Sequence, residues 1–553
     1  MALDDHSKDK GRVALPYALL AFVIMAGYSN AWSGDFLLDD VWAVAQNSFL
    51  RNWSTLPDAV STLTFAGAGQ PGGFYRPVLA FFWFIVFQLF GKSAIAYHGL
   101  NILIHVINTF LVFRLGQQIG LRRWVAFFAT LLWAVHPLNV EAVTYISGLG
   151  DVLHSMFCLL GVTILLGGVS FRRVLGTCVF YVIALGCKES AVVLPALAVI
   201  SLYLVGKDRL RFSVCIKTAP LWFICTLYLG ILFYIIQATG FMIRGHSDPE
   251  WMAIYGDNLP NRIYTALSTV PVYFSLMLWP TGLRLNRVYP FFDSLNAWPV
   301  MAGATIVLLS FAQIVWGRGK RGAGLSWGLL WFAIAYSPNA GVVFPTDALI
   351  FEHWMYMPMA GLVLGLASCL PQRPRRVEII LAGLALLIVA ALSWRSHDQN
   401  KVWQNTGTLI ESALPYSEHN EMARNSLAVY YIGQGEFDKA IEQYRIVLTH
   451  PDMLPPAMIP AVHISMAFAY LGIRFNHDDN LSVAERIQSQ YATIRQGIPN
   501  APHIPEAIRE LETTLDLNPG DYWSKVALVM IYQHQGNEEK AAYYDRLIRQ
   551  VNP

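Results

Sequence analysis

VEIILAGLALLIVAALSW, residues 377–394, is an apolar run that contains a single charged residue. A helix of about 20 mainly apolar residues is long enough to cross the hydrocarbon core of a bilayer. Three arginines, Arg373, Arg375 and Arg376, precede the run, and a polar segment follows it to the end of the chain. The run therefore predicts the last membrane span and the border between two regions with different surroundings.

Composition changes at this border. The 553 residues are 55% hydrophobic and only 14% charged, whereas soluble domains are about a quarter charged. Residues 396–553 contain 12 Lys and Arg against 19 Asp and Glu, so they carry −7 of a total net charge of +2, and residues 1–395 carry +9. This composition excludes a single soluble domain and a disordered chain. The acidic tail also argues against a nucleic-acid partner.

Upstream of the border we expect eleven spans, near residues 13–30, 95–116, 123–136, 151–169, 174–187, 190–205, 218–238, 298–316, 325–338, 354–370 and 377–394. Two more apolar stretches, 78–90 and 262–280, are expected to lie along the outer interface. Only that arrangement places all the Lys and Arg clusters on the side of the N-terminus, as cytoplasmic loops require. The prediction is a cytoplasmic N-terminus at 1–12, a lipid-embedded block at 13–395 with a long outer loop at 31–94, and an extracytoplasmic domain at 396–553.

The extracytoplasmic domain has an internal period. Pro451, Pro519 and Pro553 are separated by 68 and 34 residues, and Gly435 and Gly536 are 101 apart, close to three times 34. A helix–turn–helix unit of 34 residues is typical of tetratricopeptide repeats. We therefore expect an all-α chain, a polytopic bundle followed by a repeat solenoid whose middle is degenerate. Such solenoids bind protein on their concave surface, although a lid on the membrane block is an alternative.

Ionisable side chains gather at the expected outer ends of the helices. Inserting an ionised group at membrane depth costs at least about 2.5–3.5 kcal/mol of free energy, so residues of this kind are expected to have a structural or functional role. They are Asp39, Asp40, Arg76, His98, His105, His136, Glu141, Asp151, His154, Lys188, Glu189, Glu352 and His353. Their restriction to one face of the bilayer predicts a polar cavity there.

Structural roles compete with functional ones at these positions. Asp39 and Asp40 could cap a helix, and Arg76 could reach lipid headgroups. His98 and His105 lie seven residues apart on one helix face, where packing roles are expected more often than ligand roles.

Two further interpretations of these residues are a local ion pair and a metal site. Lys188 and Glu189 could neutralise each other. His136, Glu141, Asp151 and His154 are metal-ligand types, but no spacing enforces a site. The sequence therefore names no metal and leaves a divalent cation undecided.

Six stretches, in order, resemble a known family. They are LLDDVWAVAQN, YRPVLAF, YHGLNILIH, AVHPLNVEAVTYISGLGDVL, KESAVVLP and EHWMYMPMAG, and the repeats follow them. Together they resemble the transmembrane and tetratricopeptide-repeat O-mannosyltransferases, which are GT-C glycosyltransferases, over nearly the whole chain. Leu149 and His353 stand where the family pattern carries arginine.

The resemblance implies transfer of a sugar, mannose in the family, from a polyprenyl-phosphate donor to Ser and Thr hydroxyls of exported proteins. Phosphate is already a good leaving group, so one carboxylate base and cations that hold the phosphate suffice. We expect Asp40, which lies further from the apolar FLL stretch, to be the base, with help from Asp39 and with inversion at the sugar carbon. The residues expected to bind the donor or substrate are Arg76, Lys188, Glu189, Glu352, His353, Asp151, His136 and Glu141.

Two other functions stay open at this point. One is an outer-face polymerase or ligase that joins a lipid-linked glycan to another glycan. The other is a non-enzymatic transporter or scaffold whose repeats recruit partners. The expected partners are the lipid-linked donor, an acceptor protein held by the repeats, and the bilayer. The expected location is a bacterial inner membrane, or the endoplasmic reticulum if the chain is eukaryotic.

Overall fold

The computed structural model describes residues 3–70, 73–206, 211–239, 252–285, 287, 289–317, 319–343, 345–346, 348–371, 374–416, 420–451, 454–474 and 483–551. Arg373, and much of the insertion expected in the middle repeat, lie outside these residues. The chain divides into two compact units, residues 1–405 and 406–553. Every regular element in the described ranges is helical, which confirms the all-α class there.

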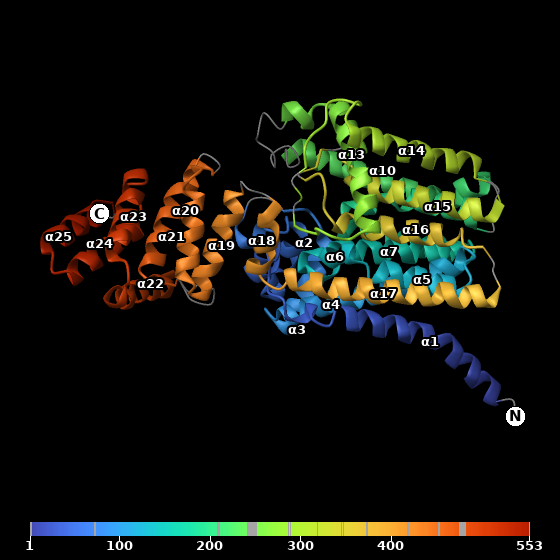
Figure 1. Ribbon diagram of the computed structural model, residues 1–553, viewed down its shortest axis with the longest axis horizontal. Coiled ribbons are helices and arrows are strands. Elements are labelled where there is room, and N and C mark those ends of the chain that lie inside the picture. The colour runs from blue at the N-terminus through green and yellow to red at the C-terminus, as the bar shows by residue number, and fades with distance from the viewer. Residues whose placement is uncertain are drawn as a thin grey trace. The chain divides into compact units, whose positions relative to one another are not determined.

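The first unit is a bundle of helices, several of which lie side by side, as α4, α5, α7, α16 and α17 do in Figure 1. Its helices are α1 (Leu3–Gly27), α2 (Leu56–Ser61), α3 (Pro77–Phe90), α4 (Ala94–Gln118), α5 (Arg123–Ala134), α6 (Val140–Thr144), α7 (Leu149–Leu166), α8 (Phe171–Cys187), α9 (Leu194–Ile200), α10 (Arg211–Thr239), α13 (Leu259–Leu278), α14 (Trp298–Trp316), α15 (Gly319–Tyr336), α16 (Tyr356–Ala367) and α17 (Arg375–Val402). Three short turns matter for the site: η2 (Val41–Ala45), η8 (Glu189–Val193) and η12 (His353–Met355).

Each stretch expected to span the membrane is helical, but the helices differ in length. By length and composition, five are long and apolar enough to cross a bilayer: Ala94–Gln118, Ile146–Leu166, Val214–Tyr234, Trp298–Trp316 and Arg375–Val402. A sixth candidate is the pair Arg123–Ala134 and Pro137–Thr144, which is bent by 56°. The chain is therefore a multi-pass membrane protein, and the count of eleven spans stays a prediction.

The border between the units lies further along than expected. Helix α17 does not end with its apolar run but continues to Val402. Its last turns are bonded to the bundle, because Ser396 Oγ donates to the Val135 carbonyl at 2.8 Å and Asn400 Oδ1 accepts from Thr144 Oγ1 at 2.8 Å. Residues 396–405 therefore belong to the membrane unit and not to the repeat domain.

Helices α15 and α16 approach each other through glycines. Gly324 and Gly328 on α15 share the spacing of Gly361 and Gly365 on α16, the small-xxx-small pattern of close membrane helices. A Cβ atom on Gly328 would lie 2.6 Å from the Cα atom of Gly365 and 2.8 Å from the carbonyl oxygen of Gly361. This contact therefore has no room for a side chain.

The second unit consists of helices that each pack against their neighbours in the chain or near-neighbours (Figure 1). They are α18 (Thr406–Ala413), α19 (Glu421–Gln434), α20 (Phe437–Val447), α21 (Ile459–Tyr470), α22 (Val483–Gly497), α23 (Ile504–Leu517), α24 (Tyr522–His534) and α25 (Glu538–Val551). The small and aromatic repeat positions Ala428, Ala440, Tyr444 and Leu528 are fully buried, so they form core.

One polar contact recurs within this unit. The Tyr431 hydroxyl donates to Glu411 and the ring lies under Lys439 Nζ, 5.3 Å from its centroid. The Tyr532 hydroxyl donates to Glu512, and Lys540 Nζ lies 4.9 Å from the centre of that ring. In both cases the glutamate precedes the tyrosine by 20 residues and the lysine follows it by eight. The recurrence supports a repeat, and the tetratricopeptide assignment itself stays a prediction.

We predict that Gly328→Leu destabilises the membrane unit. Forcing extra methylene groups into a packed contact typically costs about 1–3 kcal/mol, and here backbone atoms of α16 occupy the space. Gly383→Leu on α17 is the matched control, because nothing lies within 4 Å of a Cβ atom there. Thermal melting in detergent should show a lower Tm for Gly328→Leu only. Equal Tm values for the two variants would contradict the close approach.

Candidate functional site

The predicted ionisable residues come from element ends that the fold brings together. Asp39 and Asp40 precede η2, Arg76 precedes α3, Glu141 lies in α6, Asp151 in the first turn of α7, Lys188 and Glu189 between α8 and α9, and Glu352 and His353 at η12. Asp39 lies within electrostatic reach of Arg76 and His353. Asp151 lies within reach of Lys188 and His353. These residues therefore form one charged cluster, called here the outer cluster.

A residue in the left-handed conformation directly precedes the two neighbouring aspartates. Leu38 has φ 47°, the one positive φ among the described residues other than glycine. A bulky residue in this region stores of the order of 1–3 kcal/mol of strain, and such strain is concentrated at functional sites. After the two aspartates comes η2, a π-helical turn that begins at Val41, and such turns are also frequent at functional sites. Asp39 is exposed, while Asp40 is fully buried.

The buried position of Asp40 corrects the expectation that this residue faces water. Its Oδ2 accepts from the Leu37 amide at 3.0 Å, and its Oδ1 accepts from the Ser147 amide at 2.7 Å and from the Ser147 hydroxyl. Distance along the sequence from the apolar FLL stretch did not predict exposure, because Leu37 and Ser147 donate hydrogen bonds to Asp40 and enclose its carboxyl group. Asp40 thus ties its loop to the start of α7.

Burial sets the protonation of both carboxyl groups. It raises the pKa of Asp40 to about 8, although the bonds from Ser147 and Leu37 oppose the rise. Surrounding protein atoms also raise the pKa of Asp39 above its ordinary value, against the opposing charges of Arg76 and His353. Asp39 therefore combines access to solvent with raised basicity, which suits a general base.

Arg76 is held by a two-point ion pair. Its Nε donates to Glu189 Oε2 at 3.0 Å and its Nη2 donates to Glu189 Oε1 at 2.6 Å. The guanidinium also lies over the Phe74 ring, 4.1 Å from its centroid. Nη1 is the nitrogen that Glu189 does not use, and it lies 4.0 Å from the Cβ position of Gly150. Any phosphate would therefore meet an arginine that is already positioned.

Lys188 pairs with Asp151 instead of with its neighbour. Its Nζ donates to both carboxylate oxygens of Asp151, at 2.7 and 2.8 Å. The two side chains are only 7% and 9% exposed. Since Glu189 is taken by Arg76, a self-neutralising Lys188–Glu189 pair is wrong: both residues pair across helices. The Nδ1 of His154, one turn after Asp151, donates to the Gly150 carbonyl at 2.9 Å.

Glu141 and Glu352 fix the turn that presents His353. Glu141 Oε2 accepts from the His353 amide and its Oε1 lies against His353 Nδ1, both at 2.9 Å. Glu352 Oε1 accepts from the Arg284 amide at 2.6 Å. Both glutamates are buried, and burial together with the neighbouring Glu141 raises the pKa of Glu352 well above its usual range. The pair therefore joins three segments around His353.

The other predicted histidines are occupied by the fold. His136 Nε2 lies 3.0 Å from the Met277 carbonyl, and its Nδ1 accepts from the Leu138 amide. His105 contacts the Tyr356 hydroxyl and the Ala134 carbonyl, and His98 contacts the Gly34 carbonyl. In the described ranges no three His, Cys, Asp or Glu side chains come together as metal ligands.

Sequence reasoning missed two hydroxyl residues. The Tyr145 hydroxyl accepts from the Asp39 amide at 3.1 Å, and Ser147 donates twice to Asp40. Both lie in the YISGLGD segment that contains Asp151. Neutral hydroxyl groups cost little near a membrane, so their presence gave no signal of a site.

We predict that Lys188→Met strongly destabilises the protein. Removing one partner of a buried ion pair leaves the other charge uncompensated and typically costs about 3–5 kcal/mol. The double variant Lys188→Met with Asp151→Leu removes both charges and should regain most of the lost stability. Thermal melting compares the three proteins. A single variant that melts like the wild type, or a double variant that melts below the single, would contradict the pairing.

Comparison with known proteins gives a consistent result. No family model matches the chain. It is similar to the protein O-mannosyl-transferase TMTC1 of Homo sapiens, 24% identical over 78% of this chain and 54% of the relative. TMTC3 of Homo sapiens is 23% identical over 97% and 68%, and F38B6.6 of Caenorhabditis elegans, also named a protein O-mannosyl-transferase, is 23% identical over 74% and 59%.

The chain spans about half to two thirds of the length of these relatives. The similarity extends over most of this chain and includes the membrane unit. The resemblance that the six motifs indicated is therefore confirmed: this chain is similar to the TMTC-type protein O-mannosyl-transferases.

Proposed function

We propose that this protein is a membrane glycosyltransferase that moves a sugar from a polyprenyl-phosphate donor to hydroxyl groups of proteins on the outer face. One observation carries the proposal. Among the predicted site carboxylates, all of which lie in the described part of the chain, Asp39 is exposed and has no ion-pair partner within the described ranges, Glu189 is half-buried and paired with Arg76, and Asp40, Glu141, Asp151 and Glu352 are buried. The relatives named protein O-mannosyl-transferases support the same reaction class and suggest mannose.

The reaction needs one base and one anchored leaving group. Asp39 would take the proton of the acceptor hydroxyl as the hydroxyl oxygen attacks the anomeric carbon of the donor. The bond from that carbon to the phosphate oxygen breaks, and the polyprenyl phosphate leaves with the electron pair. The products are the glycoside, the lipid phosphate and protonated Asp39. A single displacement of this kind inverts the anomeric carbon.

Asp40 has a different role in this proposal. Its carboxyl group is enclosed by three hydrogen-bond donors, so an acceptor hydroxyl cannot reach it without breaking the loop. It would hold the Leu38 turn and thereby the direction of Asp39. The base role that we first expected for Asp40 therefore passes to Asp39.

Arg76 and His353 of the outer cluster would hold the donor phosphate. Arg76 presents Nη1 beside Gly150, and His353 presents the ring nitrogen that Glu141 does not use. Arginine binds phosphate through directed N–H groups, and a pre-positioned guanidinium loses little freedom on binding. Lys188 is enclosed with Asp151, so its contribution would be to the shape and charge of the site rather than to direct contact.

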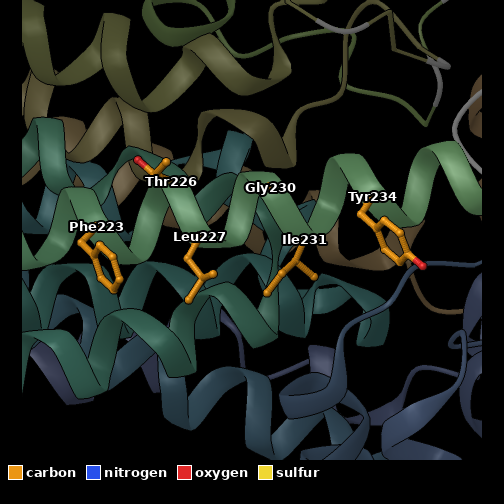
Figure 2. A pocket seen from close by; sticks show the side chains of 6 residues that line it. All are labelled: Phe223, Thr226, Leu227, Gly230, Ile231 and Tyr234. Carbon is orange, nitrogen blue, oxygen red and sulfur yellow. The ribbon is translucent and has the colours of Figure 1, made fainter.

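An apolar surface hollow on α10 fits a lipid-carried donor. The hollow has a volume of about 440 Å³. It is lined by Phe223, Thr226, Leu227, Gly230, Ile231 and Tyr234, whose positions along the helix Figure 2 shows. Tyr228, which follows Leu227 on α10, lies within electrostatic reach of Glu189 and Arg76. The helix thus offers apolar surface next to the charged cluster, as a ligand with an isoprenoid chain and a phosphate requires.

The repeat unit would bind the acceptor protein, since solenoids of this kind present extended concave surfaces to peptides. A multi-pass chain whose donor is a membrane lipid would act at the bilayer surface. The bacterial inner membrane, with the repeats outside, is the location we propose.

Transfer from a purified polyprenyl-phosphate sugar to an acceptor peptide tests the function. We expect Asp39→Asn to lower turnover by about 10²–10⁴-fold, the usual contribution of a general base. Wild-type turnover should rise with pH through the acid range, because a base with a raised pKa ionises later. Asp58→Asn is the matched control, an exposed aspartate of the same outer loop.

Two outcomes would count against the proposal. One is an Asp39→Asn protein with wild-type melting and wild-type turnover. The other is a wild-type protein that transfers sugar to a glycan acceptor and never to a peptide, which would select the polymerase or ligase.

A further inference from the structure

Three contacts fix the segment that carries the two aspartates. The Asp39 amide donates to the Tyr145 hydroxyl at 3.1 Å, and Asp40 is bonded to Ser147. Upstream, the Asp35 amide donates to the Gln404 carbonyl at 2.8 Å. Of these contacts, only the first acts on Asp39 itself, the residue proposed as base.

Tyr145 is in turn fixed from several sides. Its main-chain carbonyl accepts from Asn101 Nδ2 at 2.8 Å. Its ring lies 5.4 Å from the ring of Trp403, measured between centroids, and Trp403 is only 1% exposed. The preceding Thr144 is bonded to Asn400 at the end of α17. The hydroxyl therefore has a defined position against which Asp39 is held.

We propose that Tyr145 is a positioning residue for Asp39, a role that rests on the proposed function. The Tyr145 hydroxyl accepts the Asp39 amide directly after the left-handed residue Leu38, where the chain would otherwise be free to relax. A general base must lie within about 2.6–3.2 Å of the proton that it removes. Holding the main chain of Asp39 sets the place of its carboxylate without occupying the carboxylate oxygens.

The geometry distinguishes positioning by the Tyr145 hydroxyl from packing by the Tyr145 ring. Trp403 contacts the ring of Tyr145, whereas Asp39 contacts only the hydroxyl. Phenylalanine keeps the ring and its packing and loses the hydroxyl alone. Tyr145→Phe therefore removes the contacts of the hydroxyl to the Asp39 amide and to Ser147, and leaves the support from Trp403 in place.

The test is a double-mutant cycle on transfer from a polyprenyl-phosphate sugar to an acceptor peptide. We expect Tyr145→Phe to lower kcat by about 10- to 100-fold, the effect of a displacement of up to 1 Å, with KM values and Tm nearly unchanged. In the Asp39→Asn background, Tyr145→Phe should have no further effect, because a residue that acts through the base loses its role with the base. Tyr289→Phe is the control, since it also removes one bond from a tyrosine hydroxyl to a main-chain group, the Ser268 carbonyl.

The outcomes separate the two proposals. If the wild type transfers sugar and Tyr145→Phe equals it in kcat, or if the two substitutions multiply in the double variant, Tyr145 does not act through Asp39. If Tyr145→Phe melts at a much lower temperature, the hydroxyl stabilises the fold, and positioning of Asp39 does not explain the residue. A wild type inactive with every lipid-linked donor would remove the proposed function, and this role with it.

Discussion

Burying an ionised side chain costs several kcal/mol unless an opposite charge or hydrogen bonds replace the lost hydration. This constraint organises the end of the helix bundle that holds the outer cluster. Lys188 is matched by Asp151, Arg76 by Glu189 and His353 by Glu141, each across a large separation in sequence. The pairs tie loops and helix ends to one another, so the charges that would serve chemistry also hold the fold together.

Asp39 and Asp40 meet the same constraint in two different ways. The Asp40 carboxyl group is buried and accepts from three donors, and the Asp39 carboxyl group is exposed, within electrostatic reach of Arg76 and His353. Leu38, in the left-handed conformation, directly precedes this pair, and adjacent residues in a helical turn point about 100° apart. A site that joins a base to a phosphate-bound sugar needs this combination of a free carboxylate and pre-positioned cations.

Sequence patterns predicted the helices and the gathering of charges, but not how the charges pair. Apolar length identifies helices reliably, and ionisable residues in an apolar block stand out because each is costly. Pairing depends on which helix ends meet in three dimensions, so the neighbours Lys188 and Glu189 gave a misleading pair. The burial of Asp40 depends on a contact with Ser147, 107 residues away in sequence, and Tyr145 and Ser147 are neutral residues that carry no such signal. Helix α17 likewise continues beyond its apolar run, because its polar end is hydrogen-bonded to the bundle.

The account depends most on Asp39 being the open carboxylate of the outer cluster. Carbodiimide coupling of glycine ethyl ester to the folded protein in detergent, followed by peptide mass spectrometry, measures the access to each carboxylate. We predict that Asp39 is modified at a rate similar to that of the exposed Asp58, while Asp40, Asp151 and Glu141 are protected until the protein is unfolded. Rapid modification of Asp40 with protection of Asp39 would contradict the account.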